Sequence, residues 1–156
     1  MLSKRIIACL DVRDGCVVKG VNFEGLRNAG DPAELAIRYN QEGIDEVVIL
    51  DVTATIEKRK ALADTIHSVA QHIFLPLCVG GGIRDEHHVE AAIEAGADKV
   101  SLNTAAVTHP ELITTLARRY GSQAVIVAID AKRYNDRFQI YVRSGQESTE
   151  RDAIEW

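Results

Sequence analysis

The chain has 156 residues, of which 46% are hydrophobic and 26% charged, a composition typical of a soluble globular domain with a core of ordinary size. The formal net charge of −5 argues against a surface that binds nucleic acid, and no uninterrupted apolar stretch is long enough to cross a bilayer. The three cysteines are odd in number and lack metal-ligand spacing, so we expect reduced thiols in a cytoplasmic protein, with Cys9 and Cys78 buried in strands.

The first predicted elements surround an aspartate. Residues 5–10 form an apolar strand that ends at Asp11, and Asp14-Gly15 is a turn signal that leads into a return strand at residues 16–19. A loop is predicted from Gly20 to Gly30. A loop of this length inside a compact domain is usually functional, and we interpret it as a candidate lid.

Lys19, at the base of this loop, could reach an anionic substrate. A solvated surface charge is the alternative interpretation of this lysine.

The next segment has the signals of a capped helix followed by a strand. Asp31 is the predicted N-cap of a helix that begins at Pro32, Glu34 completes a capping box, and Gly43 ends the helix. The strand at residues 46–51 then ends in a third aspartate, Asp51.

The same alternation continues through the middle of the chain. The second helix is predicted from apolar residues at helical spacing between Leu62 and Ile73, and Asp85 caps the third. Thr108 and Glu111 form a capping box for the fourth helix. The remaining strands are predicted at residues 75–79, 99–102 and 124–129.

The pattern changes after residue 130. Alternating apolar and polar residues around the turn signal Asn135-Asp136 predict an antiparallel hairpin across residues 132–143. Ser148 or Thr149 is the predicted cap of a fifth helix, inside which the chain stops.

Alternating strands and helices predict an α/β fold with a parallel sheet and outer helices. Five such strands do not close an eight-stranded barrel, which takes about 250 residues. We therefore expect residues 1–156 to be a single, incomplete domain.

Two aspartates are the candidate catalytic groups. Asp11 and Asp130 each end a short apolar run, so each is expected at the carboxyl end of a parallel strand, where α/β sheets bind ligands. Two carboxylates on one substrate could share acid and base work. The alternative is that each aspartate caps a helix or pairs with a nearby Arg or Lys.

A second candidate site binds an anion. Gly80, Gly81 and Gly82 lead from a strand toward a helix, and their unhindered N–H groups can cradle a phosphate, although a tight turn is the simpler explanation. Asn103 and Thr104, at the next strand end, could add side-chain donors, which points to a phosphorylated small molecule. The histidine spacings do not resemble a metal site, and we expect neither metal nor other cofactor.

Six motifs together resemble one enzyme family, the cyclase subunit of imidazole glycerol phosphate synthase. They are R-I-I-A-C-L-D-V-R-D-G (5–15), V-V-K-G-V-N-F (17–23), L-R-N-A-G-D-P (26–32), V-G-G-G-I-R (79–84), A-D-K-V-S-L-N-T-A-A-V (97–107) and A-I-D-A-K-R (128–133). The resemblance implies a (β/α)₈ TIM barrel of histidine biosynthesis, here with about five strands. It also implies a bisphosphorylated substrate and ammonia delivered by a glutaminase partner subunit. The products would be imidazole glycerol phosphate and aminoimidazole carboxamide ribotide.

The resemblance also implies roles for particular residues. Asp11 and Asp130 match the catalytic acid and base. The positions that match substrate or phosphate contacts are Lys19, Asp51, Gly82, Asn103 and Thr104. Those that match the charged gate through which ammonia enters the barrel are Arg5, Glu46 and Lys99.

Two alternatives remain at this stage. The phosphoribosyl-formimino isomerase of the same pathway shares the two aspartates and a bisphosphorylated substrate, although Cys9-Leu10-Asp11 and the segment from Val21 to Pro32 favour the cyclase. A catalytically silent fragment that binds phosphate and self-associates through open strand edges is the other. For the isolated chain we expect little activity and some self-association.

Overall fold

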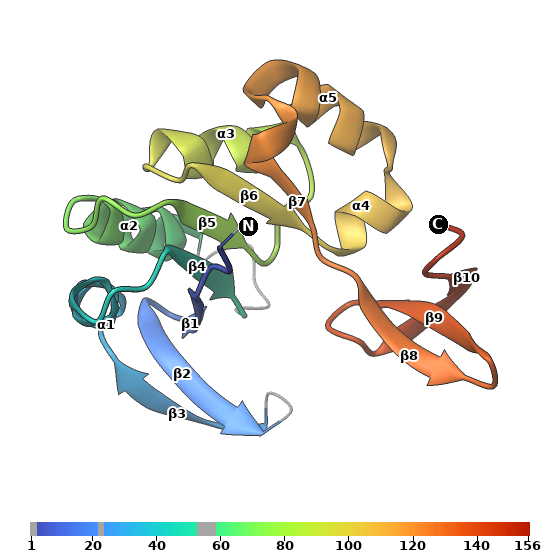
Figure 1. Cartoon of the computed structure of the whole chain (residues 1–156), viewed down its shortest axis with the longest axis horizontal. Helices are drawn as coiled ribbons and strands as arrows, with labels where there is room; N and C mark the ends of the chain where they lie inside the picture. The colour runs from blue at the N-terminus through green and yellow to red at the C-terminus, as the bar shows by residue number, and fades with distance from the viewer. Residues whose placement is uncertain (1–2, 22–23, 53–58) are drawn as a thin grey trace. The chain divides into compact units, whose positions relative to one another are not determined.

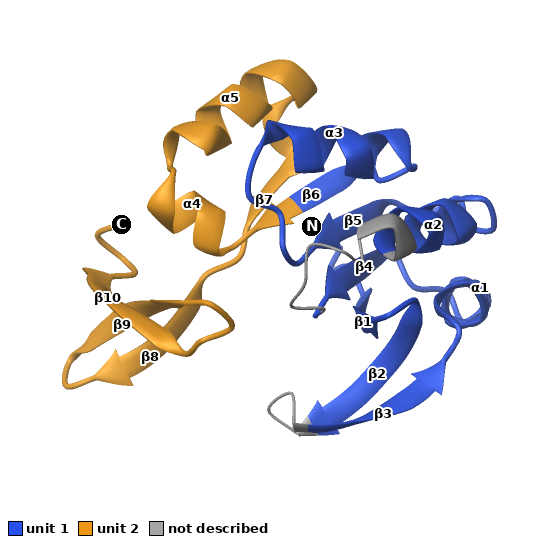
Figure 2. Ribbon diagram, turned by 180° about the vertical axis from the view of Figure 1, so that it is seen from behind, with its two compact units in different colours: residues 1–100 blue, residues 101–156 orange. Residues whose placement is uncertain are grey.

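The computed structural model describes residues 3–21, 24–52 and 59–156 (Figure 1). The chain forms two compact units, residues 1–100 and residues 101–156 (Figure 2). Strand β6 (Lys99–Leu102) crosses from the first unit into the second.

Unit 1 combines a sheet with helices in the expected α/β alternation. The strands in spatial order are β3 (Glu24–Gly30), β2 (Cys16–Val21), β1 (Ile7–Arg13), β4 (Glu46–Asp51) and β5 (Leu77–Gly80). The helices are α1 (Pro32–Gln41), α2 (Arg59–Ala70) and α3 (Glu86–Glu94). Helix α1 packs against α2, and α2 packs against α3 (Figure 1).

The central strands of unit 1 are parallel, as predicted. Cys9 of β1 lies opposite Val48 of β4, which lies opposite Cys78 of β5. Along β1, Leu10 and Val12 are buried, whereas Cys9 lies on the other, exposed face. The prediction of a buried Cys9 is therefore wrong, because the alternation of side chains along β1 turns it away from the core.

The prediction of a buried Cys78 is confirmed, since β5 is buried along its whole length. Burial, with a smaller contribution from the charge of Glu46, raises the pKa of the Cys78 thiol to about 12. Cys78 is consequently a neutral core side chain at physiological pH.

The predicted turn at Asp14-Gly15 is confirmed. Both residues have positive φ, 54° and 78°, as a two-residue hairpin turn requires, and β1 and β2 pair in antiparallel fashion around them.

The predicted loop from Gly20 to Gly30 is wrong over most of its length. Residues 24–30 form β3, which pairs with β2 through Val18 opposite Asn28 and Lys19 opposite Arg27. This strand is polar and glycine-rich, so it carries no apolar alternation by which a strand is recognised. Residues 22 and 23 of the candidate lid lie outside the described residues.

Two predicted helix starts are confirmed in unit 1. Asp31 caps α1 by accepting hydrogen bonds from the N–H groups of Ala33 and Glu34, at 2.8 and 3.0 Å. Asp85 caps α3 through the N–H of His88, at 3.0 Å. An aspartate side chain at this position satisfies N–H groups that the first helical turn leaves without partners.

Unit 2 contains two helices and a separate antiparallel sheet. Its helices are α4 (Thr104–Thr108) and α5 (Glu111–Tyr120), and strand β7 (Val125–Val127) follows a short 3-10 turn. The antiparallel sheet has the order β8 (Asp130–Tyr134), β9 (Arg137–Val142) and β10 (Glu147–Asp152), which confirms the predicted hairpin (Figure 2). Ile140 and Val142 of β9 pack with Val107, and Ala153 and Trp156 lie against them.

Two predictions for unit 2 are wrong. Thr108 does not cap α5, because it is the last residue of α4 and its hydroxyl donates to the carbonyl of Thr104 at 3.0 Å. Ser148 and Thr149 do not cap a helix but lie in β10, where the Thr149 hydroxyl donates to the carbonyl of Ile140 of β9 at 3.0 Å. Pairing with β9 satisfies backbone groups that a helix would otherwise satisfy internally.

The placement of Asp130 also differs from the prediction. The strand expected at residues 124–129 is shorter, ending at Val127, and Asp130 is the first residue of β8. The aspartate therefore opens the hairpin rather than closing the apolar strand.

Candidate active site

A charged cluster lies at the amino-terminal ends of the strands of unit 1. Glu46, the first residue of β4, is only 2% exposed, and its Oε2 accepts hydrogen bonds from Arg5 Nη1 and from Lys99 Nζ, both at 2.8 Å. Lys99 is the first residue of β6, and Arg5 lies just before β1. A buried carboxylate is tolerated when it is paired in this way. The three residues matched to the ammonia gate are thus brought together.

Asp11 and Asp51 lie toward the opposite, carboxyl ends of neighbouring parallel strands. Asp11 is opposite Leu50, the residue before Asp51, and both aspartates are partly buried. Burial raises the pKa of the Asp11 carboxyl. A raised pKa favours the protonated form, which is the form that a general acid requires.

The glycine run after β5 has a packing role next to Asp51. A Cβ on Gly81 would overlap the backbone of Asp51, and Gly81 has a φ of 87°. Gly82 also has positive φ, 66°, but open space where its Cβ would lie. The close approach to Asp51 explains why Gly81 is a glycine, whereas Gly82 leaves room at this edge of the sheet for a ligand to approach its backbone.

Lys19 is exposed on β2, opposite Arg27 on β3. Two like charges directly opposite each other on a strand pair repel, which makes the pair a favourable place for an anion. Arg27 was not identified from the sequence, because its position was interpreted as part of a loop.

Three of the predicted residues meet in unit 2. Asn103 Nδ2 donates to the carbonyl of Ala128 at 2.9 Å and to Asp130 Oδ2 at 3.3 Å. The Thr104 hydroxyl donates to Asn103 Oδ1 at 3.3 Å and accepts from the N–H of Arg143 at 3.0 Å. Asp130 itself is exposed. The side-chain amide of Asn103 and the hydroxyl of Thr104 are thus engaged with protein groups, including the candidate catalytic carboxylate.

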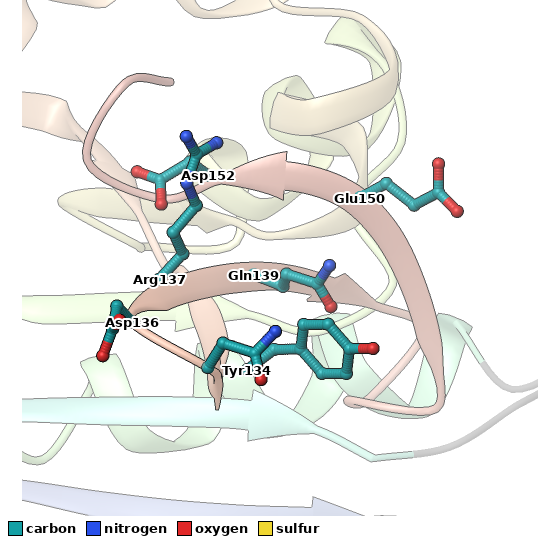
Figure 3. A pocket seen from close by; sticks show the side chains of 7 residues that line it. Tyr134, Asp136, Arg137, Gln139, Glu150 and Asp152 are labelled. Carbon is teal, nitrogen blue, oxygen red and sulfur yellow. The ribbon is translucent and has the colours of Figure 1, made fainter.

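A pocket of about 390 Å³ lies elsewhere in unit 2, on the β8–β9–β10 sheet, and holds none of the predicted site residues (Figure 3). Its lining residues are Tyr134, Asn135, Asp136, Arg137, Gln139, Glu150 and Asp152. Hydrogen bonds from the N–H groups of Glu155 and Ile154 lower the pKa of Asp152, whose carboxylate is used to hold the turn after β10.

Within the described ranges, no three His, Cys, Asp or Glu side chains are grouped so that they could hold a metal ion. In the same ranges, every helix is too short or too polar to span a membrane.

Comparison with known proteins identifies the family. A family model described as "Histidine biosynthesis protein" matches residues 5–156. Proteins named "Imidazole glycerol phosphate synthase subunit HisF" are similar over the whole chain: that of Dehalococcoides mccartyi (strain CBDB1) is 53% identical, that of Sulfurisphaera tokodaii 54% and that of Myxococcus xanthus 51%. The chain spans 62% of the length of the first and third relatives and 63% of the second.

This family has the TIM-barrel fold. The parallel strands and helices described above agree with an incomplete barrel, so the predicted fold class is confirmed. The chain belongs to the histidine biosynthesis protein family.

Proposed function

We propose that this chain is part of a cyclase subunit of imidazole glycerol phosphate synthase. The observation that carries the proposal is its similarity, at 51–54% identity over all 156 residues, to subunits of that name. The substrate would be the bisphosphorylated ribulosyl-formimino-aminoimidazole carboxamide nucleotide. Ammonia would convert it to imidazole glycerol phosphate and aminoimidazole carboxamide ribotide in the cytoplasm.

In this proposal Asp11 and Asp130 are the general acid and base. The burial of Asp11, which raises its pKa, supports the role of acid for this residue. The exposed Asp130 then takes the role of base.

Substrate contacts are assigned by the same resemblance. Lys19 and Asp51 contact the substrate, and the backbone N–H groups of Gly82, Asn103 and Thr104 contribute to phosphate binding. Backbone donors are favoured for Asn103 and Thr104 because their side-chain hydrogens already have acceptors in the protein.

The partner in this proposal is a glutaminase subunit, and ammonia passes the cluster of Arg5, Glu46 and Lys99. Support comes from the two cations that converge on one buried carboxylate oxygen, because such a cluster forms a charged barrier that small rearrangements can open. We also propose that the 156 residues form one partial barrel domain.

The isolated chain is further proposed to self-associate. Strand β3 lies at the end of the strand order of its sheet, and Ile6 and Ile7 are 66% and 44% exposed. Light scattering on the isolated chain tests this proposal. A monomer at micromolar concentration contradicts it.

The function is tested with a chimera in which this chain is joined to the part of the Dehalococcoides mccartyi relative that lies outside the match. We expect ammonia-dependent formation of imidazole glycerol phosphate from the cyclase substrate. The matched control assays the chimera with the isomerase substrate. Isomerisation without ammonia-dependent cyclisation would assign the chain to the isomerase of the same pathway instead.

A further inference from the structure

Four groups of unit 2 form a continuous line of hydrogen bonds that ends on Asp130. The N–H of Arg143, in the turn between β9 and β10, donates to Thr104 Oγ1 at 3.0 Å, and the Thr104 hydroxyl donates to Asn103 Oδ1 at 3.3 Å. Asn103 Nδ2 then donates to Asp130 Oδ2 at 3.3 Å. The line joins a hairpin turn to the Asp130 carboxylate through two side chains, those of Thr104 and Asn103.

The direction of each hydrogen bond follows from the chemistry of the groups. A backbone N–H can only donate, so Thr104 Oγ1 must accept from Arg143, and the hydroxyl hydrogen remains for Asn103 Oδ1. At the other end the carbonyl of Ala128 and a carboxylate both accept, so the NH₂ group of Asn103 must face them. The orientation of the Asn103 amide is therefore determined from both sides.

Because its side chain makes these contacts, Asn103 does not cap helix α4. It is the N-cap residue of α4, a position where an asparagine side chain normally accepts a hydrogen bond from the helix backbone. In this structure its side chain makes no capping hydrogen bond and its backbone has φ −117° and ψ −93°, outside the usual extended region of an N-cap. The Asn103 side chain instead donates to the carbonyl of Ala128 and to the carboxylate of Asp130.

We propose that Asn103 is a positioning residue for Asp130, with its own orientation set by Thr104 and by the N–H of Arg143. The proposal rests on the proposed function, in which Asp130 is a catalytic carboxylate. Asp130 is exposed, and an exposed carboxylate without a tether samples several rotamers. The Asn103 amide holds Oδ2 and leaves Oδ1 for the substrate. Small displacements of a reacting group are costly, since a shift of about 1 Å can lower a rate about 100-fold.

Positioning and phosphate binding make different kinetic predictions for Asn103 and Thr104. A side chain that only binds a substrate phosphate contributes equally to the ground state and the transition state, so its loss raises KM and leaves kcat unchanged. A side chain that positions Asp130 acts on the chemical step, so its loss lowers kcat.

The test uses the chimera described above, assayed with saturating ammonia. We expect Thr104→Val, which keeps the shape but removes the hydroxyl, to lower kcat about 10-fold, and Asn103→Leu to lower it about 100-fold, both with KM changed less than about 3-fold. Thr104→Ser keeps the hydroxyl and should retain kcat within about 2-fold. Thr108→Val is the matched control, because Thr108 lies in the same short helix and its hydroxyl only contacts the carbonyl of Thr104.

Four results separate the possible failures. Absence of ammonia-dependent cyclisation in the parent chimera would refute the proposed function itself, whereas near-normal kcat in Asp130→Asn would refute only the catalytic role of Asp130 and with it the positioning role of Asn103. A large loss of kcat in Asp130→Asn together with unchanged kcat in Thr104→Val and Asn103→Leu would overturn the positioning role. A rise in KM alone in these two variants would assign both residues to phosphate binding.

If a variant folds poorly in the chimera, the contact between Asn103 and Asp130 can be tested by NMR on the isolated chain. In the isolated chain, Asp130→Asn replaces an exposed residue, and it should shift the side-chain amide resonances of Asn103. Thr104→Ser should shift them less, and Thr108→Val should leave them in place. Asn103 amide resonances that do not respond to Asp130→Asn would show that the contact is absent in solution and overturn the proposal.

Discussion

Gly81 is the residue whose identity the structure explains most fully. The sequence showed three consecutive glycines and suggested a phosphate cradle, with a tight turn as the simpler explanation. In the structure Gly81 packs against the backbone of Asp51, as a tight turn requires, whereas Gly82 has open space where a Cβ would lie. Gly81 and Gly82 are identical in the sequence, and only the packing of the backbone shows that their surroundings differ.

We expect Gly81→Ala to lower the free energy of unfolding by about 3 kcal/mol or more. The methyl group meets the Asp51 backbone, which cannot move like a flexible side chain, and the positive φ adds strain. Gly82→Ala is the matched control, with positive φ but no neighbour, and should cost about 1 kcal/mol. Urea unfolding of both variants measures the difference, and equal losses would show that the contact with Asp51 is relaxed in solution.

For Asn103 and Thr104, the sequence predicted that the side chains could donate hydrogen bonds, but it did not predict their partners. Their types and their place after a strand suggested donors for an anion. The sequence did not reveal that Ala128, Asp130 and Arg143, which are 25 to 39 positions away, occupy these donors and acceptors. Such contacts depend on the tertiary structure and have no local signal.

Helices and apolar strands were the elements most readily predicted. The bounds of β4 and β6 agree with the predicted strands at 46–51 and 99–102, and β4 has the continuous apolar run typical of a buried parallel strand. Strands β3 and β10 were missed, because both are largely polar and include residues with positive φ, Gly25 and Glu150. Each is recognised only from the strand beside it, β2 or β9.

The helix caps give a quantitative prediction at the scale of the element. Asp31→Ala should lower the free energy of unfolding by about 1 kcal/mol, because it removes acceptors for two N–H groups of the first turn of α1. Thr108→Ala is the control, since Thr108 has the sequence signature of a cap but caps no helix. It should cost less than about 0.5 kcal/mol.

Thermal or urea unfolding distinguishes the two variants. If both variants lose the same free energy of unfolding, the hydrogen bonds of the Asp31 cap do not stabilise α1.

At the scale of the whole molecule, the candidate site residues fall into separate groups within the two units. The ion cluster of Arg5, Glu46 and Lys99 lies at the amino-terminal ends of the strands of unit 1, and Asp11 and Asp51 lie toward the carboxyl ends. Asp130 belongs to the hydrogen-bonded group of unit 2. In the proposed cyclase the ion cluster would be the ammonia gate, and Asp11 and Asp130 would be the acid and the base.

The central claim is that Asp11 and Asp130 carry the acid–base chemistry of an ammonia-dependent cyclase. Its most direct test is steady-state turnover of the chimera under saturating ammonia, for the parent and for Asp11→Asn and Asp130→Asn. Asp136→Asn, an exposed turn aspartate of the same hairpin as Asp130, is the control. We predict that kcat falls about 10²–10⁴-fold in both active-site variants, with KM little changed and the control unaffected. Near-parental turnover in either variant would contradict the account.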